Sequence, residues 1–229
     1  MHLAIDTSQS ACAVAILDPA SQTVLASDIA DLGRGHAEHL MPQIRAVLDS
    51  CKISVDQLTK IGAVCGPGSF TGLRVGLAAA RGLALALDID CVGVPALPVL
   101  AQQAVAQSTD VDHIFVVQDA RRDQAFCQLF DAAGTPVGAA GCFKLDTVES
   151  LLPAGPTLIV GSGAELVCST HSNPDRSPQT ALTSGIADIE VVAHMVAGLD
   201  RESSPPIALY LRTADAKVQT GFAVERQSA

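Results

Sequence analysis

The order of predicted strands and helices is the feature that most limits how this chain can fold. In the first part, apolar and β-branched runs at 3–8, 11–17 and 23–30 predict three strands. A helical pattern from about His36 to Cys51 follows, and Pro42 inside it implies either a kink or a later start of the helix. A strand at 61–65, a helix ending near Leu87, a strand at 91–94 and a helix after Pro95 come next. Strands that alternate with helices in this way predict an α/β protein.

The second part of the sequence repeats this order. Runs at 113–120, 124–130 and 136–145 predict three strands, followed by a short helix at 147–153, a strand at 157–164 and a helix at 186–199. Two successive β-β-β-α-β-α units predict a duplicated fold of the ribonuclease H-like or actin-like kind, with halves at 1–106 and 107–229. The Ser/Thr/Pro-rich stretch at 169–184 predicts a loop, and the polar tail after Leu211 is expected to fray.

An aspartate closes the first predicted strand of each half. Asp6 precedes Thr7 and Ser8, and Asp119 precedes Ala120 and Arg121. Strand ends of this kind face the cleft where such folds bind ligands, so the two carboxylates are candidates for holding a magnesium–nucleotide. The simpler interpretation is that each carboxylate caps its own turn. We favour this simpler interpretation over ATP hydrolysis, because Thr7-Ser8-Gln9 rather than a glycine follow Asp6 to admit a phosphate, and weak nucleotide binding stays open.

Composition restricts the classes of function. With 229 residues, of which 48% are hydrophobic, the chain can bury one large core or two small ones. A net charge of −10 argues against a free-standing nucleic-acid binder and favours contact with nucleic acid only through a partner. Seven cysteines without a C-x-x-C pair indicate neither disulfides nor a zinc knuckle, so we expect a reducing cytoplasm. We expect no signal peptide and no membrane contact, because no apolar run reaches about 18 residues.

The glycine-rich turn CGPGSFTGLRVG at 65–76 raises the question of a phosphate site. Gly66 and Gly68 flank Pro67, and Ser69 or Thr71 can cap the following helix, whose free N–H groups would favour an anion. No Lys-Ser/Thr pair follows, the glycine spacing misses the dinucleotide fingerprint by one residue, and no G-x-S-x-G surrounds Ser69. The turn is therefore a poor phosphate cradle by sequence.

Small residues continue along the helix that follows this turn. Gly72, Gly76, Ala80 and Ala84 recur every four residues, and glycine inside a helix costs about 1 kcal/mol relative to alanine. Close packing would repay that cost. The stripe lies either against the sheet of its own domain or against another subunit, and the sequence leaves both alternatives open.

Several short motifs, in a fixed order along most of the chain, resemble the TsaB (YeaZ) family. The GPGSFTGLRVG block at 66–76 is the most specific of them. The others are weak singly and strong together: IDTS at 5–8, HAEHLMP at 36–42, RGLAL at 81–85, VGVPAL at 92–97, DARR at 119–122 and LYLR at 209–212.

The resemblance implies an actin-like (ASKHA) fold and a non-catalytic role beside TsaD. In that role the chain would support the transfer of a threonylcarbamoyl group to adenosine 37 of tRNAs that read ANN codons. It implies TsaD as heterodimer partner, the ATPase TsaE as a further member of the complex, a homodimer when the chain is alone, and tRNA contact only through the complex. It implies no cofactor for the chain by itself, with ADP or ATP as a candidate at the subunit contact.

The catalytic relative carries H-x-x-x-H after the corresponding helix and strand, and its histidines bind the catalytic metal. In this chain the matching positions are Ala96 and Leu100, which cannot ligate a metal. His36 and His39 lack a third ligand at a telling spacing, so we predict no metal site and no catalytic residue.

Two sets of residues are predicted to form sites. The interface set lies on the two helices of the first half and consists of His36, Leu40, Ile44, Gly72, Val75, Gly76, Ala79, Ala80 and Leu83. The nucleotide set lies at turns and strand ends and consists of Asp6, Gly66, Gly68, Ser69, Asp119, Arg121, Gly161 and Gly163. For Arg121 and Arg122, pairing with Asp119 or Asp123 and contact with a partner or a phosphate remain open. The competing hypothesis is an enzyme acting alone, either an actin-like ATPase or a metallopeptidase-like protein.

Overall fold

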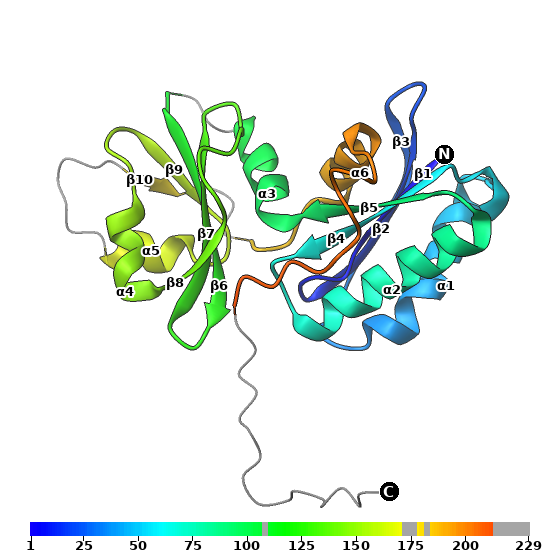
Figure 1. The fold of residues 1–229 in the computed structure, drawn as a ribbon, viewed down its shortest axis with the longest axis horizontal. Coiled ribbons are helices and arrows are strands. Elements are labelled where there is room, and N and C mark those ends of the chain that lie inside the picture. Colours follow the sequence, from blue (N-terminus) through cyan, green and yellow to red (C-terminus); the bar gives the residue numbers. More distant parts are fainter. Residues whose placement is uncertain (107–109, 171–177, 181–183, 213–229) are drawn as a thin grey trace, which may run out of the picture.

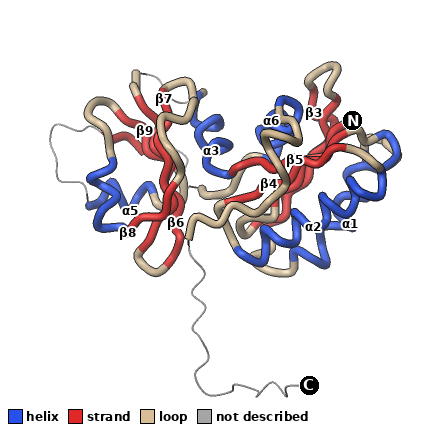
Figure 2. Tube along the Cα trace, viewed as in Figure 1, coloured by secondary structure: helices blue, strands red, loops and turns tan. Residues whose placement is uncertain are grey.

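Two mixed β-sheets, each covered by helices on both faces, make up the protein (Figures 1 and 2). The computed structural model describes residues 1–106, 110–170, 178–180 and 184–212. The predictions for residues 213–229 and for most of 169–184 therefore lie outside the described residues.

The first sheet has five strands in the order β3-β2-β1-β4-β5. Its strands are β1 (His2–Asp6), β2 (Ala11–Asp18), β3 (Thr23–Asp31), β4 (Lys60–Gly66) and β5 (Asp90–Pro95). β2 is antiparallel to β1 and to β3, whereas β4 is parallel to β1 and to β5. Every residue of β1 is buried, because this central strand lies between two layers of helices.

Helices α1 (His36–Ser50) and α2 (Phe70–Leu87) cover one face of this sheet (Figure 1). Their buried side chains form one apolar cluster with β1, β2 and β4. Pro42 lies in the second turn of α1 and is exposed, so the helix begins before it. A short 3-10 turn, Val55–Gln57, precedes β4.

The second sheet also has five strands, in the order β10-β9-β6-β7-β8. Read from β8 to β10, this is the order of the first sheet, with β6 in the place of β1. The strands are β6 (His113–Arg121), β7 (Gln124–Asp131), β8 (Gly141–Lys144), β9 (Thr157–Val160) and β10 (Pro178–Thr180). α4 (Leu145–Val148), the 3-10 turn Glu149–Leu151 and α5 (Ala164–Thr170) follow β8 and β9. The predicted duplication and actin-like fold class are therefore confirmed.

The helices α3 (Ala96–Val105) and α6 (Ile189–Gly198) depart from the predicted division of the chain. α6 follows the second sheet in sequence, yet Ile189, Val192 and Val196 pack on the first sheet. α3 follows the first sheet, yet Leu97, Leu100 and Ala104 pack against strands of the second. The expectation that 186–199 would complete the second half was wrong, and α5 occupies that place.

Three further local predictions need correction. The strand predicted at 136–145 is confined to Gly141–Lys144, and the one predicted at 157–164 ends at Val160. β10 lies within the stretch predicted as a loop and pairs in parallel with β9. Its pairing partner is distant in the sequence, so local composition gave no indication of it.

α2 is long and apolar enough, by length and average composition, to cross a membrane, and it alone meets this test in the described part of the chain. The apolar run of this helix is interrupted by Arg74 and Arg81, so the sequence pattern did not indicate an apolar run of this length. The inner face of α2 packs on the first sheet, as expected of a core helix, which passes the same test.

The segment Pro205–Arg212, here called the C-terminal strap, joins the two halves (Figure 1, orange). The N–H of Leu209 donates to the carbonyl oxygen of Cys65 in β4 at 2.7 Å, and Leu209 packs on the core of the first half. Leu211 packs on a core cluster of the second half, and Arg212 Nη1 donates to the carbonyl oxygen of Ala120 at 2.9 Å. The strap therefore contacts both halves of the protein.

Candidate functional site

The small-residue stripe of α2 faces the end of β1. The hydroxyl of Thr7 donates to the carbonyl oxygen of Gly72 at 2.7 Å. A Cβ added to Gly76 would lie 2.5 Å from Thr7 Oγ1, and one added to Gly72 would overlap the Thr7 carbonyl oxygen. The glycines therefore serve a close approach inside the chain, which is the first of the two alternatives left open by the sequence.

Most other residues of the predicted interface set also point inward. Leu40, Ile44 and Ala80 are buried in the core of the first half. Val75, Ala79 and Leu83 are half-buried and pack against the same core. His36, the first residue of α1, is half-buried. The buried members, Gly72 and Gly76 among them, pack inside the chain, and their part in an interface stays a prediction.

The outer face of the same two helices carries exposed apolar side chains. Leu85 is 84% exposed, Phe70 55% and Met41 47%. Ala78, Gly82 and Ala86 of α2 are exposed as well. Exposed apolar side chains on a helix surface are candidates for contact with a partner, and here they alternate with the exposed Arg74 and Arg81. Sequence reasoning missed this face because the inner stripe has the more regular spacing.

The glycine turn is held from both sides by backbone. Ser69 caps α2, because its Oγ accepts from the N–H of Gly72 at 3.3 Å, and its own N–H donates to the carbonyl oxygen of Ser8 at 2.7 Å. A Cβ on Gly68 would lie 2.5 Å from the Ser8 carbonyl oxygen, and one on Gly66 would lie 2.8 Å from that of Leu209. The glycines of the turn thus admit neighbouring protein backbone.

Asp6 is buried at the end of β1. Its Oδ1 accepts from the N–H of Ser8 at 2.7 Å, which is the turn-capping role of the simpler interpretation. Burial raises the pKa of the Asp6 carboxyl above its ordinary value, whereas hydrogen bonding from Ser8 and the charge of His36 act in the opposite direction. The polar neighbours of Asp6 thus come from its own half of the molecule.

The second half contains the rest of the predicted nucleotide set. Asp119 accepts from the backbone N–H of Arg121 at 2.7 Å, and its own N–H donates to Ser162 Oγ at 3.0 Å. Gly161 has a positive φ of 102°, and a Cβ there would overlap the carbonyl oxygen of Val117. A Cβ on Gly163 would lie 2.7 Å from Val117 Cγ1. These glycines pack the β9–α5 turn onto β6, and nucleotide binding stays a prediction.

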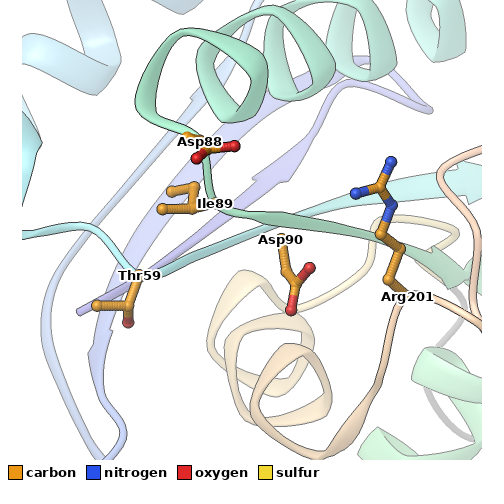
Figure 3. A pocket seen from close by; sticks show the side chains of 5 residues that line it. All are labelled: Thr59, Asp88, Ile89, Asp90 and Arg201. Atoms are coloured by element: carbon orange, nitrogen blue, oxygen red, sulfur yellow. The ribbon is translucent and has the colours of Figure 1, made fainter.

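Two hollows lie near the first half, and neither is lined by the nucleotide set. One, of about 360 Å³, is lined by Thr59, Asp88, Ile89, Asp90 and Arg201 (Figure 3). It lies where α2 ends and β5 begins, remote in sequence from both predicted aspartates. The other, of about 320 Å³, lies between α2 and the C-terminal strap and is lined by Arg74, Leu77, Ala78, Arg81, Pro206, Ile207, Ala208 and Tyr210.

The positions that correspond to the metal histidines of the catalytic relative are structural here. Ala96 and Leu100 lie in α3, and both side chains are buried in apolar clusters. Within the described ranges, no group of three or more His, Cys, Asp or Glu side chains is arranged to hold a metal ion. His36 and His39 belong to α1 and gain no third ligand from another element described here.

Comparison with known proteins shows a consistent set of similarities. The profile of the TsaD family, described as tRNA N6-adenosine threonylcarbamoyltransferase, matches residues 28–215. An uncharacterized protein of Mycobacterium tuberculosis is 31% identical over 223 residues, which is 94% of this chain and 93% of that protein. The tRNA threonylcarbamoyladenosine biosynthesis protein TsaB of Bacillus subtilis is 37% identical over 128 residues, about half of each chain (56% and 54%).

A solved structure resembles the whole fold. YeaZ from Pseudomonas aeruginosa superposes with a TM-score of 0.74 at 25% identity and covers 92% of this chain and 99% of that one. Because both sheets are included in this coverage, the similarity extends beyond a single half of the duplicated unit.

Proposed function

Because the chain belongs to the TsaB (YeaZ) family, we propose that it is the partner subunit of a TsaD-type transferase in the threonylcarbamoylation of adenosine 37 of ANN-decoding tRNAs. The single observation that carries the proposal is the similarity to proteins named for threonylcarbamoyladenosine biosynthesis, among them those of Bacillus subtilis and Escherichia coli. In this proposal the exposed apolar side chains of α1 and α2 would contact the partner subunit.

The partner role is non-catalytic in this proposal. Ala96 and Leu100 fill core positions where the transferase would need metal ligands, and neither side chain can bind a metal. The glycine turn is closed by the backbone of Ser8 and Leu209. In the complete assembly, the TsaE ATPase would join the pair, ADP or ATP would be held at the subunit contact, and the chain alone would form a homodimer. We place this assembly in the cytoplasm.

The alternative is an enzyme that acts alone, an ATPase or a metallopeptidase-like protein. It would use Asp6 and Asp119, but each of these carboxylates is engaged with backbone N–H groups of its own half. A turnover assay of the purified chain with ATP and with peptide substrates, with and without added metal, tests this alternative. Turnover that is lost in both Asp6→Ala and Asp119→Ala would favour it over the partner role.

The contact surface is tested by the double variant Met41→Glu/Leu85→Glu. Both side chains are exposed, so the variant should unfold within about 0.5 kcal/mol of the wild type. If the face meets the transferase subunit, burying two new carboxylates should weaken association by tenfold or more, as expected for central interface positions. Isothermal calorimetry with the TsaD-type subunit, together with a threonylcarbamoylation assay of the mixture, measures both effects.

Leu25→Glu is the matched control, because Leu25 is an exposed leucine on the edge strand β3. It should bind like the wild type. Unchanged affinity of Met41→Glu/Leu85→Glu would reject this face as the contact surface, and a wild-type chain that neither binds the transferase subunit nor supports modification would reject the proposed function.

A further inference from the structure

Cationic side chains gather where the C-terminal strap crosses from one half to the other. We define the arginine edge as Arg74 on α2, Tyr210 and Arg212 on the strap, and Arg121 at the end of β6. Arg74 Nε donates to the hydroxyl of Tyr210 at 3.2 Å, and Arg212 Nη1 donates to the carbonyl oxygen of Ala120, the neighbour of Arg121. These contacts link Arg74 to the strap and the strap to the end of β6, where Arg121 follows Ala120 in the sequence, so the edge draws on both halves.

The alternation of the strap explains why these side chains share one side. Leu209 and Leu211 are half-buried and pack against the cores of the two halves. Along extended backbone, neighbouring side chains point to opposite sides. Tyr210, which is 49% exposed, therefore points outward, and Arg212 is half-buried on the same side.

The aromatic rings orient the guanidinium of Arg74. Its central carbon lies 3.8 Å from the ring centroid of Phe70, and the rings of Phe70 and Tyr210 are 5.5 Å apart. A guanidinium stacked in this way is pre-organised for a bidentate contact with an anion. Arg212 is half-buried and uses one of its five N–H groups on the carbonyl oxygen of Ala120.

The β6–β7 hairpin presents Arg121 at an unusual backbone conformation. Arg121, Arg122 and Asp123 have positive φ values of 64°, 56° and 57°, which non-glycine residues seldom adopt. The Arg121 side chain is 86% exposed, and its Nε is 4.0 Å from the carboxylate of Asp119, too far for a strong pair. Asp119 and Asp123 offset part of the positive charge of the hairpin, whereas Arg74 and Arg212 form no ion pair with a carboxylate of the described chain.

From this arrangement we infer that the arginine edge binds the sugar–phosphate backbone of RNA directly. The chain carries a net charge of −10 and has only 14 basic residues, so any direct contact with RNA must be confined to a small surface. A guanidinium group beside exposed aromatic rings, as at Arg74, Phe70 and Tyr210, is typical of surfaces that bind single-stranded nucleic acid. The inference rests on the proposed function, whose substrate is a tRNA, and modifies the expectation that tRNA is reached only through the partner.

The test compares tRNA binding by wild-type chain, Arg121→Glu and Arg121→Glu/Arg212→Glu over a series of salt concentrations. Fluorescence anisotropy with an unmodified ANN-decoding tRNA is measured for the chain alone at low ionic strength and for its mixture with the TsaD-type subunit. Each lost phosphate contact should reduce the slope of log Kd against log salt by about one. We expect the double variant to bind tRNA about tenfold more weakly, or worse, and Arg121→Lys/Arg212→Lys to retain most of the wild-type slope.

Arg201→Glu is the matched control, because Arg201 is an exposed arginine beside the hollow of Figure 3 and not on the edge. Arg121→Glu should fold like the wild type, because the Arg121 side chain is 86% exposed, so weaker tRNA binding by this variant would not come from misfolding. Equal tRNA affinity and slope for wild type and both charge-reversal variants would overturn the inference. The inference would also be overturned if the charge-reversal variants bound tRNA like the wild type but no longer associated with the TsaD-type subunit. That result would assign the edge to a protein partner. Subunit association of the wild type, measured without tRNA, tests the proposed function separately.

Discussion

The hydroxyl of Thr7 donates a hydrogen bond of 2.7 Å to the carbonyl oxygen of Gly72 and so joins the end of β1 to the first turn of α2. The contact requires the helix backbone to lie directly against the strand. Such an approach is possible only because positions 72 and 76 carry no side chain. The exposed face of α2 is therefore the one opposite Gly72 and Gly76.

Gly76→Leu should destabilise the chain itself. The new side chain would start 2.5 Å from Thr7 Oγ1, and overpacking of this kind costs about 1–3 kcal/mol. Gly82→Ala is the control on the same helix, because nothing lies within 4 Å of a Cβ there. Gly82→Ala should raise the free energy of unfolding by about 0.5–1 kcal/mol, because alanine has the higher helix propensity. Urea unfolding measures both, and a Gly76→Leu protein as stable as the wild type but unable to bind its partner would restore the interface role of the stripe.

Lys60→Met should loosen α6 from the first sheet. Lys60 Nζ donates to the carbonyl oxygen of Leu199 at 2.8 Å and to those of Val196 and Ala197 at 3.4 Å. It thereby provides a hydrogen-bond donor for carbonyl groups at the C-terminal end of α6. Loss of these charged hydrogen bonds should lower the free energy of unfolding by about 1.5–3 kcal/mol. Lys144→Met, at an exposed lysine of β8, should change it by less than about 0.5 kcal/mol. Similar unfolding midpoints for the two variants would contradict this role of Lys60.

His2→Gln should remove part of the acid sensitivity of the fold. Burial, with the charges of Lys60 and the N-terminal ammonium, lowers the pKa of His2 from 6.5 to about 4. Below pH 6.5 the unfolded chain therefore binds a proton that the folded chain rejects, so His2 makes the fold lose stability as pH falls from about 6.5 to about 4. Urea unfolding at several pH values in this window measures the effect. Parallel pH profiles for His2→Gln and the wild type would refute it.

Asp6→Asn should raise the stability of the fold at neutral pH. Burial raises the pKa of Asp6, so the unfolded chain, with an Asp pKa of about 3.8, loses this proton at lower pH than the folded chain does. The free energy of unfolding therefore falls as pH rises above about 3.8. Asparagine keeps an oxygen for the N–H of Ser8 but carries no charge. The stability gain over the wild type should therefore shrink on acidification and vanish below about pH 4.

Asp18→Asn provides the opposite case for the same measurement. Hydrogen bonds from Ala20 and Ser21 lower the pKa of this exposed carboxyl, so its contribution is present at neutral pH and is lost on acidification. The variant should be slightly less stable than the wild type at neutral pH. If Asp6→Asn also proves less stable there, the buried carboxylate stabilises the fold and our assignment is wrong.

The duplicated fold could be predicted because each strand and helix has its own periodicity. The buried runs of β1, β2 and β4 and the helical spacing of α1 are local patterns, and they determined the order of elements in both halves. The aspartate at the end of β1 and the glycine turn before α2 were recognisable from the same short stretches. The order of the motifs along the chain was enough to indicate the family.

Which surface covers which was decided only by tertiary structure. Periodicity shows that α6 has an apolar face, but both sheets offer a face of similar chemistry, and α6 packs on the one that is distant in sequence. The stripe of α2 likewise predicts close packing without naming the neighbour, which proved to be Thr7. The arginine edge comes from residues at positions 74, 121, 210 and 212, which only the strap brings together. The sequence patterns by themselves predict the strands and helices. Which surfaces are buried and which are exposed depends on contacts between distant segments, because a local pattern does not indicate a neighbour far along the sequence.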